Sequence, residues 1–276
     1  MQRVTAVLVV LAVFAGANRS DAQILSRGDL FGPGAPPAMI GVELGLGMHQ
    51  QQGTYQAACS CEFTDGSMSG FLGGLLFELP LDYEWTLGIA AKFDFKGLDN
   101  STITQDTATM RFLANDSVAK GIIHMHRTGT VRETFLTFNP FVRYEFYRNG
   151  PFVQIGPGIG IVLSSSFKHT RELLSSSVQL LDSNLVPTGQ VIPGVTFENG
   201  TNSETLQDEK KVANINTLQI TLNASLGYDI PVGDNAVIAP MVTYSLPFTA
   251  VRPDIQSTGW KVSSLYVSAG FKYKLD

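Results

Sequence analysis

The sequence predicts an all-β fold: an eight-stranded antiparallel up-and-down β-barrel that spans a membrane. Three observations predict it. The chain begins like a secreted protein, and its body contains eight runs in which apolar and polar residues alternate. The connections between these runs are alternately short and long. Alternation with a period of two is the signature of strands that present one face to an apolar medium.

The N-terminus has the layout of a secretory signal peptide. Arg3 supplies a positive charge, residues 4–17 are uncharged and almost wholly apolar, and small residues before Gln23 suit a signal peptidase. The apolar stretch is shorter than the roughly 18–20 residues that a membrane-spanning helix needs. We therefore expect a signal peptide over residues 1–22, with a retained signal anchor as the alternative. Residues 23–37, rich in Gly and Pro, are expected to form an extended periplasmic leader.

The first three runs establish the period of two from residue 38 onward, where we expect the barrel domain (residues 38–276) to begin. Alternate positions from Ile40 to Met48 are apolar, and the run from Trp85 to Phe95 alternates most clearly. The second run, which ends at Leu79, is less regular because two of its leucines fall on the opposite face. It is joined to the third run by a very short connection.

The fourth and fifth runs extend from Leu136 to Phe146 and from Val153 to Leu163. The Asn149-Gly150 pair between them favours a tight hairpin turn. Because a tight hairpin turn joins neighbouring strands, we expect the two runs to pair as antiparallel strands.

The last three runs extend from Leu218 to Ile230, from Ile238 to Phe248 and from Leu265 to Leu275. A short connection, residues 231–235, joins the first two of them. Four long connections separate the pairs of runs: residues 49–66, 97–130, 164–211 and 249–260. Short periplasmic turns and long extracellular loops are the layout of outer-membrane barrels, and an even strand number places both termini on the short-turn side.

The two faces of the runs differ in a way that indicates which one meets lipid. Small residues and opposed charges share the polar face, and such a face suits a narrow lumen in which unpaired charge is costly. The charged residues are Glu43, Glu78, Glu84, Lys92, Asp94, Arg143, Glu145 and Asp229. Among them, we expect Glu43, Lys92, Asp94 and Arg143 to form a neutralising network. The alternative is a soluble barrel with its apolar face inside.

The apolar face is ordered along its length. Aromatic residues such as Trp85 and Tyr144 lie toward the short-turn ends of the runs, and others such as Phe71 and Phe95 lie toward the long-loop ends. Aliphatic residues fill the middle. Aromatic girdles on both sides of an aliphatic band are typical of membrane barrels.

Two segments also resemble a known family. Residues 149–160, with the sequence Asn-Gly-Pro-Phe-Val-Gln-Ile-Gly-Pro-Gly-Ile-Gly, resemble the turn and fifth strand of small PorT-like outer-membrane barrels. Leu136 to Tyr144 is similar to the preceding strand there. The resemblance covers residues 38–276 and implies a barrel in the bacterial outer membrane, but no single activity. One departure is the C-terminus, where Asp276 stands in place of the aromatic residue that ends many such barrels.

The composition and motifs favour no enzyme. A net charge of −5 argues against a nucleic-acid partner. The glycine-rich segment 156–160 is followed by no helix pattern, so we interpret it as a lumen-facing strand rather than a nucleotide loop. No Ser, His and Asp residues combine into a catalytic pattern. We expect no catalytic residue and no cofactor.

The histidines and cysteines are the only candidate transition-metal ligands of note. All four histidines and both cysteines fall in or beside the predicted long loops. Lipid-facing strands exclude such residues, so loops collect them whether or not a metal is bound, and we expect no metal site. A small metal site is the less favoured alternative. The residues are His49, His124, His126, His169, Cys59 and Cys61. We expect the two cysteines either to form a small disulfide or to stay reduced.

We therefore predict a non-enzymatic outer-membrane barrel in contact with the lipid bilayer. Its loops 97–130 and 164–211 are the expected sites for a protein partner, and residues 178–181 and 190–197 within the second have strand character. One alternative is a narrow or lateral-opening channel for small apolar solutes, favoured by prolines within three of the runs. The other is a soluble secreted ligand-binding barrel.

Overall fold

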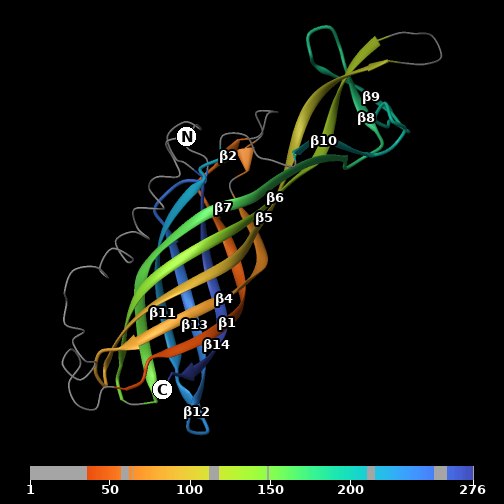
Figure 1. The fold of residues 1–276 in the computed structure, drawn as a ribbon. Coiled ribbons are helices and arrows are strands. Elements are labelled where there is room, and N and C mark those ends of the chain that lie inside the picture. The colour runs from red at the N-terminus through yellow and green to blue at the C-terminus, as the bar shows by residue number, and fades with distance from the viewer. Residues whose placement is uncertain are drawn as a thin grey trace.

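Eight long strands close into a barrel in the computed structural model (Figure 1), which describes residues 36–56, 62–63, 65–111, 118–147, 149–209, 215–251 and 260–275. Each strand pairs antiparallel with its neighbours, and pairing from Met39↔Lys274 to Gln52↔Lys261 joins the first strand to the last. The predicted eight-stranded barrel is confirmed. The strands of the ring are β1 (Met39–Gln52), β4 (Gly66–Pro80), β5 (Trp85–Arg111), β6 (Val118–Glu145), β7 (Pro151–Leu173), β11 (Leu218–Tyr228), β13 (Ala236–Pro247) and β14 (Lys261–Lys274).

Six shorter strands lie outside the ring. They are β2 (Tyr55–Gln56), β3 (Glu62–Phe63), β8 (Val178–Leu181), β9 (Pro187–Ile192), β10 (Ser203–Glu209) and β12 (Ile230–Val232). β2 and β3 pair with each other within the predicted 49–66 connection, and β12 pairs with β13 at the short-turn end. Over the described ranges, no helix has the length and apolar character to cross a membrane.

The burial of side chains follows the predicted alternation. Leu44 and Leu46 on β1 are 67% and 72% exposed, whereas Glu43, which directly precedes Leu44, is 3% exposed. The polar face therefore lines the interior and the apolar face is outside. A soluble barrel with an apolar interior is excluded, because a water-facing surface of exposed Leu, Ile, Val and Phe around the whole ring would be unstable in water.

The aromatic residues lie at both ends of this apolar surface. Trp85 and Tyr144 are in contact at the short-turn end, with ring centroids 4.9 Å apart. Phe71 and Phe95 stack at 4.1 Å at the opposite end of the band. Glu84 departs from the prediction, because it lies in the turn before β5 and is exposed rather than lumen-facing. The chain reverses there before the alternation begins.

β5 and β6 are far longer than a membrane crossing requires. They contain 27 and 28 residues, whereas a tilted transmembrane strand needs about 9–11. Their pairing is unbroken from Trp85↔Tyr144 to Arg111↔Val118, so the prediction of a loop over residues 97–130 was wrong. Beyond the bilayer the outer face no longer has to be apolar, so the alternation fades although Thr and Ile still favour strand.

The predicted loop 164–211 is also largely strand. β7 continues to Leu173, and β8, β9 and β10 follow it. Strand character over residues 178–181 is confirmed, whereas the predicted strand over 190–197 ends at Ile192. We use the term extension for the described residues of 101–128 and 167–209, which project together from one side of the barrel (Figure 1). An apolar cluster of Ile123, Met125, Leu173 and Val178 forms its core.

The opposite end of the barrel has tight turns, as predicted. Asn149 adopts a positive φ of 52° between β6 and β7, and Gly233 adopts 67° between β12 and β13. Asn and Gly tolerate this region of backbone conformation at little cost. The expected signal peptide (1–22) and nearly all of the expected leader (23–37) lie outside the described residues and stay predictions.

Candidate functional site

The charged residues in the short-turn half of the lumen form one buried network. Arg143 contacts Glu78 Oε1 at 3.1 Å and Glu145 Oε1 at 3.0 Å, and it also pairs with Asp229. Lys272 Nζ lies 2.9 Å from Glu78 Oε2 and 3.1 Å from Asp229 Oδ1. Arg143, expected in one neutralising network with Glu43, Lys92 and Asp94, pairs instead with these three other carboxylates. Lys272 was missed because a lysine near the end of the last strand also suits a solvent-exposed position.

A second group of charges lies farther along the lumen. Lys92 Nζ is 2.6 Å from Glu43 Oε2, as the prediction of a neutralising network requires. Asp94 Oδ2 lies 3.3 Å from Lys96 Nζ and accepts a hydrogen bond of 2.7 Å from Tyr266. Each cation thus has a carboxylate partner. Such pairing is what makes charge tolerable in a narrow interior, since an isolated buried ion is costly.

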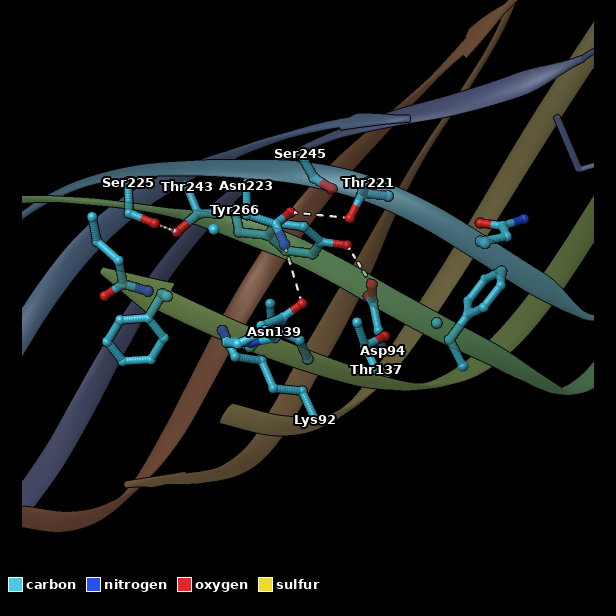
Figure 2. Close-up of a pocket in the computed structure, with 18 of the residues that line it drawn as sticks. Lys92, Asp94, Thr137, Asn139, Thr221, Asn223, Ser225, Thr243, Ser245 and Tyr266 are labelled. Carbon is cyan, nitrogen blue, oxygen red and sulfur yellow. Dashed lines mark hydrogen bonds between the residues drawn. The ribbon is translucent and has the colours of Figure 1, made fainter. Parts of the chain in front are cut away.

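A small polar cavity lies beside the second group, and Lys92, Asp94 and Tyr266 are part of its lining (Figure 2). Its volume is about 40 Å³, which is room for a few waters and no more. Amide and hydroxyl side chains point into it. Asn223 Nδ2 donates to Asn139 Oδ1 at 3.1 Å, and Ser225 and Thr243 are hydrogen-bonded at 2.8 Å. The interior is therefore filled by side chains, as expected for eight strands, and provides no wide pore.

An apolar cluster covers the long-loop end of this polar interior. Its members come from several strands of the wall and from the connections, and each is at most 4% exposed. They are Phe63, Leu98, Val131, Phe167, Val251, Trp260 and Val262. The cluster thus forms an apolar layer at the base of the extension.

β5 presents a free backbone edge in the extension. β4 pairs with it only as far as Asn100, and beyond that point the described residues pair with β5 solely through β6. The amide of Glu145 donates to Glu84, so even-numbered residues of β5 make the hydrogen bonds to β6. The odd-numbered residues from Ser101 to Thr109 therefore direct their N–H and C=O groups toward the open edge.

The histidines are not in loops, and that prediction was wrong. His49 lies inside the barrel on β1 with Nδ1 2.8 Å from Ser264 Oγ, and His169 is buried on β7. His124 and His126 lie on the outer side of β6 and share that side, as the extended-segment prediction requires. The loops were assigned too widely, because these strands continue beyond the apolar band.

His169 lies within the base of the extension. Its ring is edge-on to Phe63, with centroids 5.9 Å apart. Burial lowers the pKa of His169, and the positive charges of Arg127 and Arg171 lower it further. A neutral imidazole is therefore the stable form at this position.

No set of three or more His, Cys, Asp or Glu side chains in the described part of the chain could hold a metal ion. Cys59 and Cys61 lie outside the described residues, and their redox state stays a prediction. The expected absence of catalytic residues and cofactors also stays a prediction.

Comparisons with known proteins identify the class of fold. A family model described as "Outer membrane protein beta-barrel domain" matches residues 22–251, and no curated protein matches the chain. Similar solved structures include the attachment invasion locus protein Ail of Yersinia pestis, with 11% identity, 86% of this chain and 99% of that chain covered, and a TM-score of 0.31. OprG of Pseudomonas aeruginosa shows 12% identity, 87% and 97% coverage and a TM-score of 0.31.

Proposed function

Because the chain belongs to the outer membrane protein beta-barrel domain family, we propose that it is a non-enzymatic protein of the bacterial outer membrane that binds a partner through its extension. The partner contributes an extended segment that adds to the free edge of β5. This mode of recognition uses main-chain hydrogen bonds for affinity and side-chain positions for specificity.

The observation that carries the proposal is the unprotected edge of β5 from Ser101 to Met110. Natural edge strands are blunted by prolines, bulges or outward charges. This segment contains no proline, its register with β6 has no shift, and its exposed positions are all uncharged. They are Ser101, Ile103, Gln105, Thr107 and Thr109. The charge of Asp106 is on the other face, where it pairs with Arg127.

The lumen gives less support to the alternative of a channel for small apolar solutes. Its lining is amide, hydroxyl and paired charge, and an apolar solute would gain little by entering it. A buried apolar cluster also lies at the long-loop end. The extension, by contrast, has an apolar core of its own, against which Ala108 and Met110 of β5 pack.

In-cell photo-crosslinking tests the proposal. A photoreactive residue at Thr107 is expected to give a discrete protein adduct, and Gln105→Pro is expected to abolish it. The amide of residue 105 faces the open edge, so proline removes a donor to the partner but none to β6.

The matched control is Gln105→Val, which changes the same side chain and keeps the amide. It is expected to retain the adduct. An adduct that survives Gln105→Pro, or one that Gln105→Val abolishes equally, would show that recognition does not use the backbone edge. Absence of any adduct at Thr107 would exclude this edge as the binding site.

A further inference from the structure

Two histidines on the outer side of β6 take no part in the packing of the extension. His124 is exposed and His126 is half-buried, and both lie beyond the membrane-spanning part of the strand. Neither imidazole forms a hydrogen bond or an ion pair with any other described residue. His49, by contrast, is bonded to Ser264 inside the barrel. The two outer imidazoles are therefore free to bind a ligand.

The strand fixes the spacing of the two rings. Side chains two positions apart on a strand project from the same side, about 7 Å apart along it. The ladder to β5 continues without a shift through Gln105↔His124 and Ile103↔His126, so both histidines belong to regular strand. The expectation of no metal site rested on a loop at this position, and a loop holds two histidines at no fixed distance.

Two imidazoles at this spacing can bind one metal ion. Metal–nitrogen bonds are about 2.0–2.1 Å long, so two nitrogens on opposite sides of one ion are about 4 Å apart. Rings that rise from positions about 7 Å apart reach this separation when they incline toward each other. His124 and His126 can do so, because rotation about their side-chain torsions is not blocked by a hydrogen bond or an ion pair within the described chain.

The charge around the pair favours a cation. Glu172, directly across from His126 on β7, is exposed, and its carboxylate has no partner among the described residues. Ile103 and Gln105, the nearest residues of β5 on this face, are uncharged. Arg127 follows His126 but is buried on the opposite face. In the described part of the chain, a negative charge and no positive charge thus adjoin the two rings.

We propose that His124 and His126 bind one divalent copper ion, with water in the remaining coordination positions. Cu²⁺ binds a given set of nitrogen ligands most tightly of the divalent first-row metals, and tetragonal coordination by nitrogen and oxygen suits it. No third His, Cys, Asp or Glu of the described residues completes the site, whereas zinc sites in proteins mostly use three or four protein ligands. The site uses side chains on the face of the sheet, so it is independent of the open backbone edge of β5.

Copper titration of the full, untagged chain in lipid nanodiscs tests this proposal. Cys59→Ser and Cys61→Ser remove the two thiols, which would compete for the metal. Electron paramagnetic resonance is expected to show one Cu²⁺ per chain with two imidazole nitrogens. His124→Gln should weaken binding by about 100-fold, because it removes the advantage of a second ligand held on the same scaffold. His126→Gln should weaken binding equally.

Two double variants separate the spacing of the histidines from their number. Ile122 and Thr128 lie on the same side of β6 as His126. Ile122→His added to His126→Gln gives two histidines two positions apart, and binding should return. Thr128→His added to His126→Gln gives two histidines about 13 Å apart along the strand, and binding should stay weak. Fewer than two imidazole nitrogens in the parent spectrum, unchanged affinity after His126→Gln, or equal rescue by the two double variants would overturn the proposal.

Discussion

Replacing Arg143 by methionine tests the energetics of the lumen most sharply. The guanidinium is 1% exposed, lies 3.7 Å over the ring of Phe152, and contacts three carboxylates. Methionine keeps an unbranched stem but leaves Glu78, Asp229 and Glu145 with Lys272 as the nearest cation. Removing one partner of a buried ionic network costs about 3–5 kcal/mol. We expect a loss of this size in the free energy of unfolding.

The assay is equilibrium unfolding by urea in lipid vesicles, followed by the fluorescence of the two tryptophans. Arg171→Met is the matched control, since the Arg171 side chain is 29% exposed and pairs with Glu204, and exposed pairs contribute at most about 1 kcal/mol. Asp229→Asn added to Arg143→Met should recover part of the loss. A loss for Arg143→Met no larger than that of Arg171→Met would refute the account of the lumen as a coupled ionic network.

Two further substitutions have expected outcomes. Gly156→Ala should lower the free energy of unfolding by about 1–3 kcal/mol, because a Cβ there would lie 2.1 Å from the carbonyl oxygen of Pro140; urea unfolding measures it. His169→Phe should flatten the pH dependence of the extension. Since the pKa of His169 lies below its ordinary value of 6.5, the unfolded form binds more protons as pH falls through that range, and stability decreases. Hydrogen exchange of β7 amides between about pH 7.5 and 5.5 measures this change.

Each of these substitutions has its own control. Gly160→Ala lies on the same strand and face, but its Cβ would make an ordinary contact at 3.5 Å with Phe135, so stability should change little. Equal losses at the two glycines would contradict the close approach at Gly156. For the extension, His124→Phe alters an exposed histidine on β6 and should leave the pH dependence intact. A pH dependence that persists in His169→Phe would assign it to other groups.

The transmembrane part of the fold was predictable from sequence because lipid imposes a strict alternation. Every outward position from Trp85 to Phe95 must be apolar while the lumen accepts Lys92 and Asp94, and this contrast is visible residue by residue. The alternating runs also predicted the number of strands, and the lengths of their connections predicted which end of the barrel has the short turns. The alternation also placed Glu43 and Arg143 in the lumen without any knowledge of their partners.

The extension was not predictable in this way. From Ser101 to Arg111 both faces of β5 carry Thr, Ser and Gln, since neither meets lipid, and such a segment has the composition of a loop. Only its β-branched residues favoured strand. The interruption of the β6–β7 ladder at Pro140 and Pro157 was also not predictable, because the register of β6 and β7 is needed to place the two prolines opposite each other. Sequence shows that prolines are present in strands but does not show which residues they face.

The most direct test of the account is spin-label accessibility along the outer face of β5. Single cysteines in a Cys59→Ser and Cys61→Ser background would be labelled at outward positions from Leu87 to Thr109 in lipid vesicles. We predict high oxygen accessibility, the mark of lipid contact, as far as Phe93 or Phe95, and high accessibility to a water-soluble nickel complex from Ile103 onward. Water accessibility at Leu87 and Ile89, or lipid contact that continues to Thr107, would contradict a membrane barrel with a projecting extension.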